Sequence, residues 1–244
     1  MKVKESTGTE KTPMAEGFHR ARLFSIIDLG TQVTKFGPKR QLRLYYESLE
    51  PNEQIEFHKE KGKEPRIVFL KENITVHDGI FKLNWKRSNL GKHIAAFLGS
   101  KRLTPELRKG FDLAFLLGKC GYITITHNKT EDRTFENITS AAPPKEEDKT
   151  NTWQKAHNNF MLFDLSGEPC MYYDIEKKEK NDTLDVKDAF KMLWPGLREK
   201  VASSDEGKAL GLTFSKDEYE DQDHDTSEAI EEEMVEENDE ENVF

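Results

Sequence analysis

The chain has few of the residues that build disulfide frameworks, zinc sites or membrane spans. Only two of its 244 residues are cysteines, Cys120 and Cys170, and they form no Cys-x-x-Cys pair. This excludes a disulfide framework and a cysteine-based zinc site. No stretch approaches the roughly 18 consecutive apolar residues that span a bilayer, and the polar N-terminus differs from a secretory signal. We therefore expect a cytoplasmic protein without a membrane partner.

Signatures of catalysis are also absent. The sequence has no Gly-x-x-x-x-Gly-Lys-[Ser/Thr] loop, no His-Glu-x-x-His and no Gly-x-Ser-x-Gly, and its histidines are scattered singly. Acids and a lysine gather around Glu56, Glu60 and Lys61, as a metal nuclease requires, but such clusters are common in a chain with 34% charged residues. The prediction is a protein that is not an enzyme and needs no cofactor and no metal.

Positive charge is missing from the C-terminal end. Residues 217–244 contain 15 Asp or Glu and no Lys or Arg, which gives this segment a charge of −15. Because the whole chain carries −9, residues 1–216 carry +6 and form a mildly basic body. Like charges at this density repel one another and cannot bury enough apolar surface to offset ordering entropy. We therefore expect a disordered acidic tail over residues 213–244.

Alternating apolar and polar residues predict strands in the first half of the chain. Three such runs, separated by turn residues or polar loops, are Phe18–Asp28, Gln41–Glu47 and Arg66–Val76. In the second run, the apolar residues Leu42, Leu44 and Tyr46 share one face. The odd-numbered residues include Arg43 and Tyr45, and their face is expected to point to solvent.

A helix and two more strands follow. Ser88 and Gly99 bound a helical pattern at Asn89–Leu98, and strand patterns recur at Cys120–His127 and Thr134–Ser140. Three strands, a helical insertion and two strands are the layout of the OB-fold, although several small α+β folds share that order. The predicted fold is mainly β. It has a flexible arm over residues 1–16 and a five-stranded OB-fold barrel over residues 17–142, with the helical insertion between strands 3 and 4.

An α/β extension is expected over residues 143–212. Asn159–Leu165 and Cys170–Asp174 fit a hairpin, and Asp185–Trp194 has apolar residues spaced as one helix face. A short helix is predicted over Leu197–Ala202. The extension is too small to count as a second domain. We expect it to pack on the barrel or on a neighbouring subunit, which leaves a homodimer open.

Cations and aromatic rings gather on the elements that bind ligands in OB-folds. Single-stranded DNA needs cations along its phosphates and flat rings on which its bases stack. The candidate residues are Lys35, Phe36, Lys39, Arg40, Arg43 and Tyr45 at the first turn and second strand, Lys129, Arg133 and Phe135 at the last hairpin, and Trp85 and Lys86 before the helix. Each one alone has an ordinary structural alternative, as a solvated cation or as a ring that covers the core. As a group they predict a DNA-binding face.

The end of the tail has a more specific pattern. Val243 and Phe244 follow an acidic run, and a terminal phenylalanine beside the chain carboxylate suits a basic-rimmed pocket on a partner. A solubilising tail is the plain alternative. A tethered polyanion can also compete with nucleic acid for a basic site, an effect that salt weakens.

Several short motifs, in their order and spacing, resemble bacteriophage single-stranded DNA-binding proteins of the OB-fold class. They are Leu29-Gly30-Thr31-Gln32, Arg40–Glu47, Ser88-Asn89-Leu90, Lys109–Asp112 and Leu117-Gly118-Lys119. The resemblance covers residues 15–142 and, more loosely, residues 185–210. It implies sequence-tolerant DNA binding in phage replication, recombination and repair, inside the host cytoplasm. It also implies that the acidic tail recruits replication or recombination proteins.

Two other functions compete with this interpretation. One is a protein-interaction adaptor or DNA-mimic scaffold that does not itself bind DNA. The other is a nuclease that uses the acidic cluster near Glu56.

Overall fold

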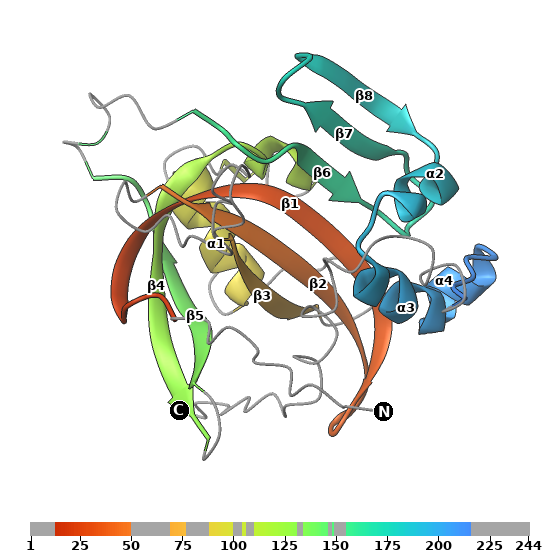
Figure 1. The fold of residues 1–244 in the computed structure, drawn as a ribbon, viewed down its shortest axis with the longest axis horizontal. Coiled ribbons are helices and arrows are strands. Elements are labelled where there is room, and N and C mark those ends of the chain that lie inside the picture. Colours follow the sequence, from red (N-terminus) through yellow and green to blue (C-terminus); the bar gives the residue numbers. More distant parts are fainter. Residues whose placement is uncertain are drawn as a thin grey trace, which may run out of the picture.

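The computed structural model describes residues 13–49, 69–76, 88–99, 104–105, 110–130, 134–145, 148 and 155–215. Within them the chain is mainly β, as predicted (Figure 1). The first part contains β1 (Gly17–Thr34), β2 (Gly37–Ser48), β3 (Phe69–Val76), α1 (Asn89–Leu98), the 3-10 turn η3 (Leu113–Leu116), β4 (Cys120–Lys129) and β5 (Thr134–Ala142). The C-terminal extension contains β6 (Phe160–Phe163), β7 (Cys170–Asp174), β8 (Glu179–Leu184), α2 (Val186–Lys191), α3 (Pro195–Ser203) and α4 (Asp205–Ala209).

The long strand β1 organises the whole sheet. One of its edges pairs with β2, which in turn pairs with β3, and all these pairings are antiparallel. The other edge is shared between two strands. Its residues 17–22 pair with β4, and Ser25–Ile27 pair in parallel with β6. The branch lies at Leu23, which exchanges backbone hydrogen bonds with Gly118 and Lys119 at 2.8 and 3.0 Å.

The sheet is open, so the predicted closed barrel is not confirmed. β5 pairs with β4, and β7 and β8 extend the sheet beyond β6. Closure would require a ladder between β3 and β5, and none joins these strands in the part of the chain that the structure describes. The predicted order of three strands, a helix and two strands is nevertheless present, because α1 follows β3 and precedes β4.

The predicted helix has the ends that its sequence specifies. Ser88 Oγ accepts a hydrogen bond from the Gly91 amide at 3.1 Å, which caps the N-terminus. Gly99 follows the last turn with a φ of +91° and donates its N–H to the Ala95 carbonyl at 3.0 Å. Leu90, Ile94 and Phe97 lie on the buried face of α1.

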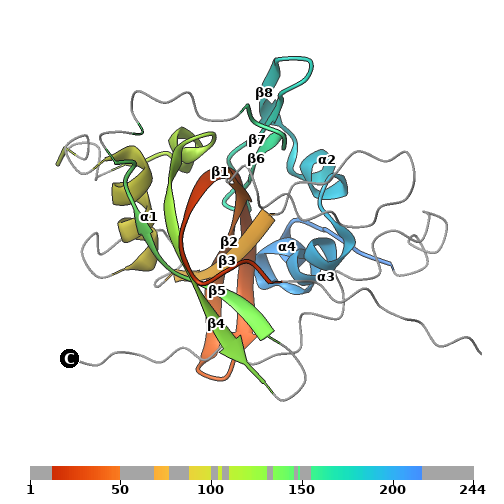
Figure 2. The same ribbon diagram turned by 60° about the vertical axis from the view of Figure 1, so that its left-hand side comes forward.

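Two apolar cores lie on opposite faces of β1 and β2. The first is formed by residues of β1, β2, β4 and α1, among them Leu23, Ile26, Leu44, Tyr46 and Ile94. The second joins Phe24, Ile27, Leu29 and Tyr45 to residues of the extension such as Phe163, Phe190, Leu197 and Val201. Figure 2 shows α1 and the helices α2–α4 on opposite sides of these strands. The extension therefore packs on the sheet of its own chain.

No helix of the described residues is long and apolar enough to cross a membrane.

Candidate nucleic-acid interface

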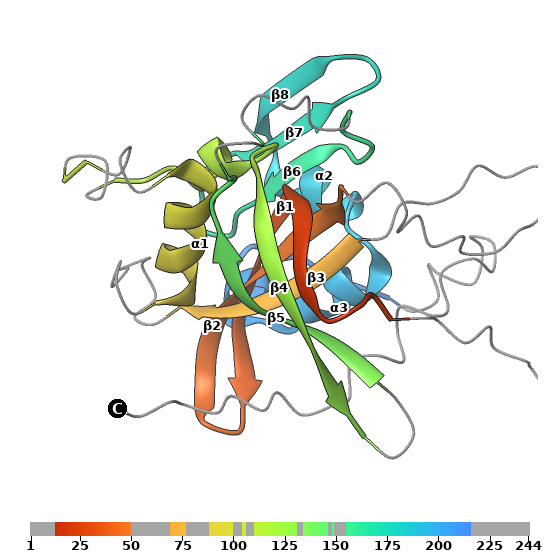
Figure 3. The same ribbon diagram turned by 90° about the vertical axis from the view of Figure 1, so that its left-hand side faces the viewer.

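Two hairpins extend from the same end of the sheet, away from β7 and β8 (Figures 1 and 3). One is formed by β1 and β2, and the other by β4 and β5. In OB-folds the loops between strands 1 and 2 and between strands 4 and 5 flank the ligand. Predicted site residues are therefore expected at these two hairpin tips.

The tip of the β1–β2 hairpin presents an aromatic ring with two cations. The Phe36 side chain is 57% exposed. The ammonium groups of Lys35 and Lys39 lie 5.3 and 4.9 Å from the centroid of its ring. Thr34 shapes the turn, because its hydroxyl donates to the Gly37 carbonyl at 2.8 Å and accepts from the Phe36 amide at 3.2 Å. This arrangement places an exposed aromatic ring beside two ammonium groups, the types of side chain that stack on bases and pair with phosphates in single-strand binding proteins.

The base of this hairpin is held by charged groups. Arg40 forms an ion pair with the buried carboxylate of Asp28, and its guanidinium lies 3.7 Å from Glu206 in α4. The Glu206 carboxylate also accepts hydrogen bonds from the Thr31 amide and hydroxyl, at 2.7 and 2.8 Å. The hairpin tip therefore projects from a base that the extension fixes in place.

The pairing with Asp28, with only 9% of the Arg40 side chain exposed, argues against the predicted contact between Arg40 and DNA phosphates. Burial alone would lower the pKa of its guanidinium, but the hydrogen bond and the charge of Asp28 outweigh it and hold that pKa above its ordinary value. The side chain is charged, and its charge is compensated inside the protein.

The prediction that Arg43 and Tyr45 of β2 point to solvent is also wrong. Arg43 is 4% exposed and Tyr45 is 3% exposed. The Tyr45 ring packs against Phe24 at 6.1 Å and against Trp194 at 5.0 Å between centroids. The physical reason is the extension, which covers this face with its own apolar residues. Neither side chain is available to bases or phosphates.

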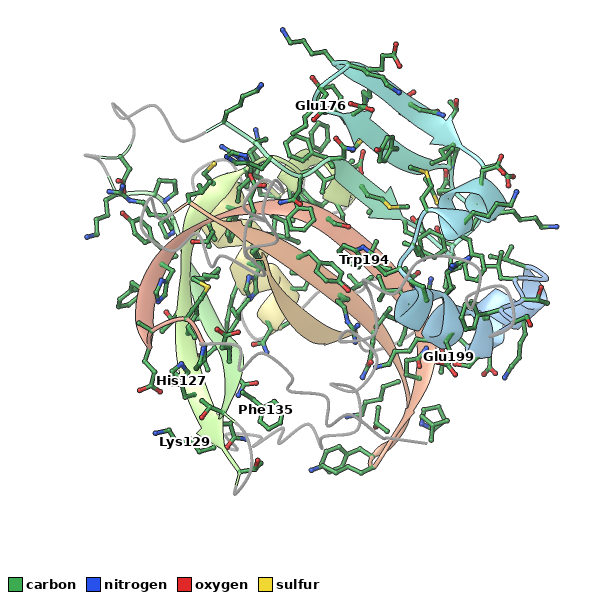
Figure 4. All side chains as sticks on the ribbon, viewed as in Figure 1. His127, Lys129, Phe135, Glu176, Trp194 and Glu199 are labelled. Atoms are coloured by element: carbon green, nitrogen blue, oxygen red, sulfur yellow. The ribbon has the colours of Figure 1, made fainter. Side chains whose placement is uncertain are left out.

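The β4–β5 hairpin carries two further predicted residues, labelled in Figure 4. Lys129 is exposed at the end of β4, and Phe135 is half-buried opposite Asn128. Arg133, Trp85, Lys86, Val243 and Phe244 lie outside the described residues. The structure thus leaves two groups of predicted residues at the hairpin tips, Lys35, Phe36 and Lys39 on one and Lys129 and Phe135 on the other.

Two features of this region were not predicted. The carboxylate of Glu206 comes from a polar segment some 170 residues after the hairpin that it holds, and no local sequence signal connects the two. Trp194 of the extension packs on Tyr45, yet it remains 40% exposed. Among the described residues no group of three or more His, Cys, Asp or Glu is placed to hold a metal ion.

A scan against protein-family models and a search of curated proteins each found no match to this chain.

Proposed function

We propose that this protein binds single-stranded DNA with little sequence preference and without catalysis. Phosphates lie along Lys35, Lys39 and Lys129, and bases stack on Phe36 and Phe135. The observation that carries the proposal is the exposed Phe36 ring with two lysine ammonium groups within 5.3 Å of its centroid, at the tip of a hairpin whose base is fixed. Positioning by a rigid base favours binding because less motion is lost when the ligand arrives.

The strand order supports this proposal. The pairing sequence β3-β2-β1-β4-β5, with α1 between β3 and β4 in the chain, is the one expected of an OB-fold left open between its third and fifth strands. OB-folds are partly open barrels that bind oligonucleotides beside these loops. We place the chain in that class as part of the proposal.

The acidic tail forms the second part of the proposal. The −15 charge of residues 217–244 repels phosphates, so this segment recruits proteins of phage replication, recombination or repair instead, with Val243 and Phe244 as the docking tip.

The DNA proposal is tested by fluorescence anisotropy with labelled oligo-dT. The triple variant Lys35→Ala/Phe36→Ala/Lys39→Ala removes one ring and two charges, and it should weaken binding at least about tenfold, since one stacked base alone contributes roughly 1–3 kcal/mol. For wild-type protein, three phosphate contacts on a single strand predict a slope of about −2 for log affinity against log salt.

The matched control is Lys177→Ala/Lys180→Ala. These two lysines are exposed beside the β7–β8 turn, far from the hairpin tips (Figure 1), and removing them takes away the same charge. Its affinity should stay within about twofold of wild type, because remote charges are screened over roughly 10 Å. Equal losses in both variants would show that only net charge matters and would remove the proposed site.

A non-binding adaptor is the second candidate. The burial of Arg43 and Tyr45 favours it, because the central part of the expected DNA face is occupied by the protein itself. The adaptor predicts no change in anisotropy at any salt concentration, whereas the DNA-binding proposal predicts binding that strengthens as salt falls.

A further inference from the structure

One face of β2 leads from the hairpin tip into the extension. The register of β2 with β3 is continuous from Arg40 to Glu47, so its odd-numbered residues share one face. Lys39 begins this row beside Phe36 and is partly exposed, and Gln41, Arg43 and Tyr45 continue it and are buried. Other parts of the chain therefore cover these three residues and form the protein surface above them.

Helix α3 lies along the same side of the sheet. At its start, Trp194 packs on Tyr45 with the two rings at 71°. Near its end, the Lys200 carbonyl accepts a hydrogen bond from the Gln32 side chain at 3.2 Å, at the base of the hairpin. The helix therefore connects the middle of β2 to the β1–β2 hairpin, and Figure 4 shows Trp194 and Glu199 along this path.

Trp194 occupies a position that helix stability does not explain. It is the N-cap residue of α3, where Ser, Thr, Asp or Asn would accept a hydrogen bond from the first turn, and its side chain makes no capping bond. Its neighbours hold it firmly, because Leu193 is buried and Pro195 begins the helix. A large ring is thus held at the surface, 40% exposed, on a rigid support.

We infer that Trp194 is a base-stacking residue for single-stranded DNA, in place of the Tyr45 ring that it covers. This inference rests on the proposed function and extends its site from the hairpin tip across the extension. Bound DNA runs from Phe36 along α3, past the half-exposed cations Arg198 and Lys200, to Trp194. Trp offers the largest flat surface of any side chain, and base stacking is tolerant of sequence.

The distances suit this path. The eight residue steps from Gly37 to Tyr45 span roughly 26 Å at about 3.3 Å per residue of strand. At about 3.4 Å per stacked nucleotide, that length corresponds to about eight nucleotides, within the 4–16 that single OB-folds cover. An oligo-dT shorter than the path should reach only one of the two rings.

The experiment compares Trp194→Phe, Trp194→Leu and the neighbouring exposed Met192→Ala in the oligo-dT assay. Leu fills space over Tyr45 but offers no ring, so Trp194→Leu should weaken binding about 5- to 150-fold, the range for one lost stacked base. Trp194→Phe should keep most of the affinity while the quenching of tryptophan fluorescence by oligo-dT decreases. Met192→Ala should bind like wild type.

The outcomes separate the two proposals. If wild type binds and Trp194→Leu binds within twofold of it, or if Trp194→Phe loses none of the quenching, this inference is overturned and the proposed function stands. If Phe and Leu weaken binding equally, Trp194 acts only by packing and the inference fails in the same way. If wild type itself does not bind, the proposed function fails and the inference fails with it.

Discussion

The two cores on either side of β1 and β2 are held together differently. The first core, under α1, is formed by apolar side chains and includes a buried polar contact in which Tyr46 Oη lies 2.9 Å from His93 Nδ1. The second core is also apolar, but carboxylates at its border fasten the extension to the strands. Apolar contacts have no preferred direction, whereas a hydrogen-bonded carboxylate fixes the position of the segment that it binds.

Two sets of carboxylate contacts among the described residues illustrate this. Glu47 in β2 is fully buried, forms an ion pair with Arg22, and accepts from the backbone and side-chain amides of Asn158 at 3.1 and 2.9 Å. Asp28, Arg40 and Glu206 form the other, at the base of the hairpin. The difference teaches that the second core adds to its apolar packing charged contacts between residues far apart in the chain, such as Arg40 and Glu206.

The largest expected effect comes from removing the extension. A chain that ends at Thr150 leaves Phe24, Ile27 and Tyr45 uncovered and should lose cooperative unfolding, because an apolar sheet face of this size does not stay folded in water. Circular dichroism melts and size-exclusion chromatography measure this. A chain that ends at Ser215 keeps both cores and should melt like wild type. Cooperative unfolding of the shorter chain would show that the first core is an independent domain.

Glu47→Ala should have the next largest effect. It leaves the buried charge of Arg22 without its partner, which costs about 3–5 kcal/mol of unfolding free energy. Urea denaturation measures the loss. Asp182→Ala, which breaks an exposed ion pair with Lys180, is the control and should leave the midpoint unchanged. If the two variants were equally stable, the carboxylate fastening would have no energetic role.

Gly30→Ala should have a smaller but position-specific effect. Gly30 has a φ of +69°, and a methyl group there would lie 2.4 Å from Ser204 Oγ. Gly37 has a φ of +92° with open space around it. Both substitutions carry backbone strain of about 1–3 kcal/mol, but only Gly30→Ala also pushes α4 away from the hairpin. Thermal unfolding should therefore show a lower midpoint for Gly30→Ala than for Gly37→Ala, and equal midpoints would argue against tight docking.

The sequence predicted those elements whose signals are local. The capped helix α1, the strands β4 and β5 and the β6–β7 hairpin are present close to their predicted bounds. β1 runs to Thr34, beyond the predicted end at Asp28, because cross-strand pairing with Gly37–Arg40 extends it through glycine and polar residues. β8 was missed, since the run Glu179–Leu184 is polar and joins the sheet only through β7. The short helix α4 was missed for a similar reason.

The site was harder to predict, and β2 shows why. Alternation assigned Arg43 and Tyr45 to a polar face, and they do share a face. What alternation cannot reveal is whether a distant segment covers that face, and here residues more than 140 positions later do so. Phe36 and Lys129, by contrast, lie at hairpin tips, where none of the described helices or strands packs over them, and they are exposed as expected.

The double burial of β1 and β2 also matters while the chain is being made. The ribosome releases the N-terminal strands first. Tyr45 emerges 156 residues ahead of Val201, which belongs to the same core. At about 5–20 residues per second, that interval lasts roughly 8–30 s. Throughout it the nascent chain displays Phe24, Leu29 and Tyr45 to other molecules in the cell. Synthesis speed and chaperone access during this window should therefore govern the yield of correctly folded protein.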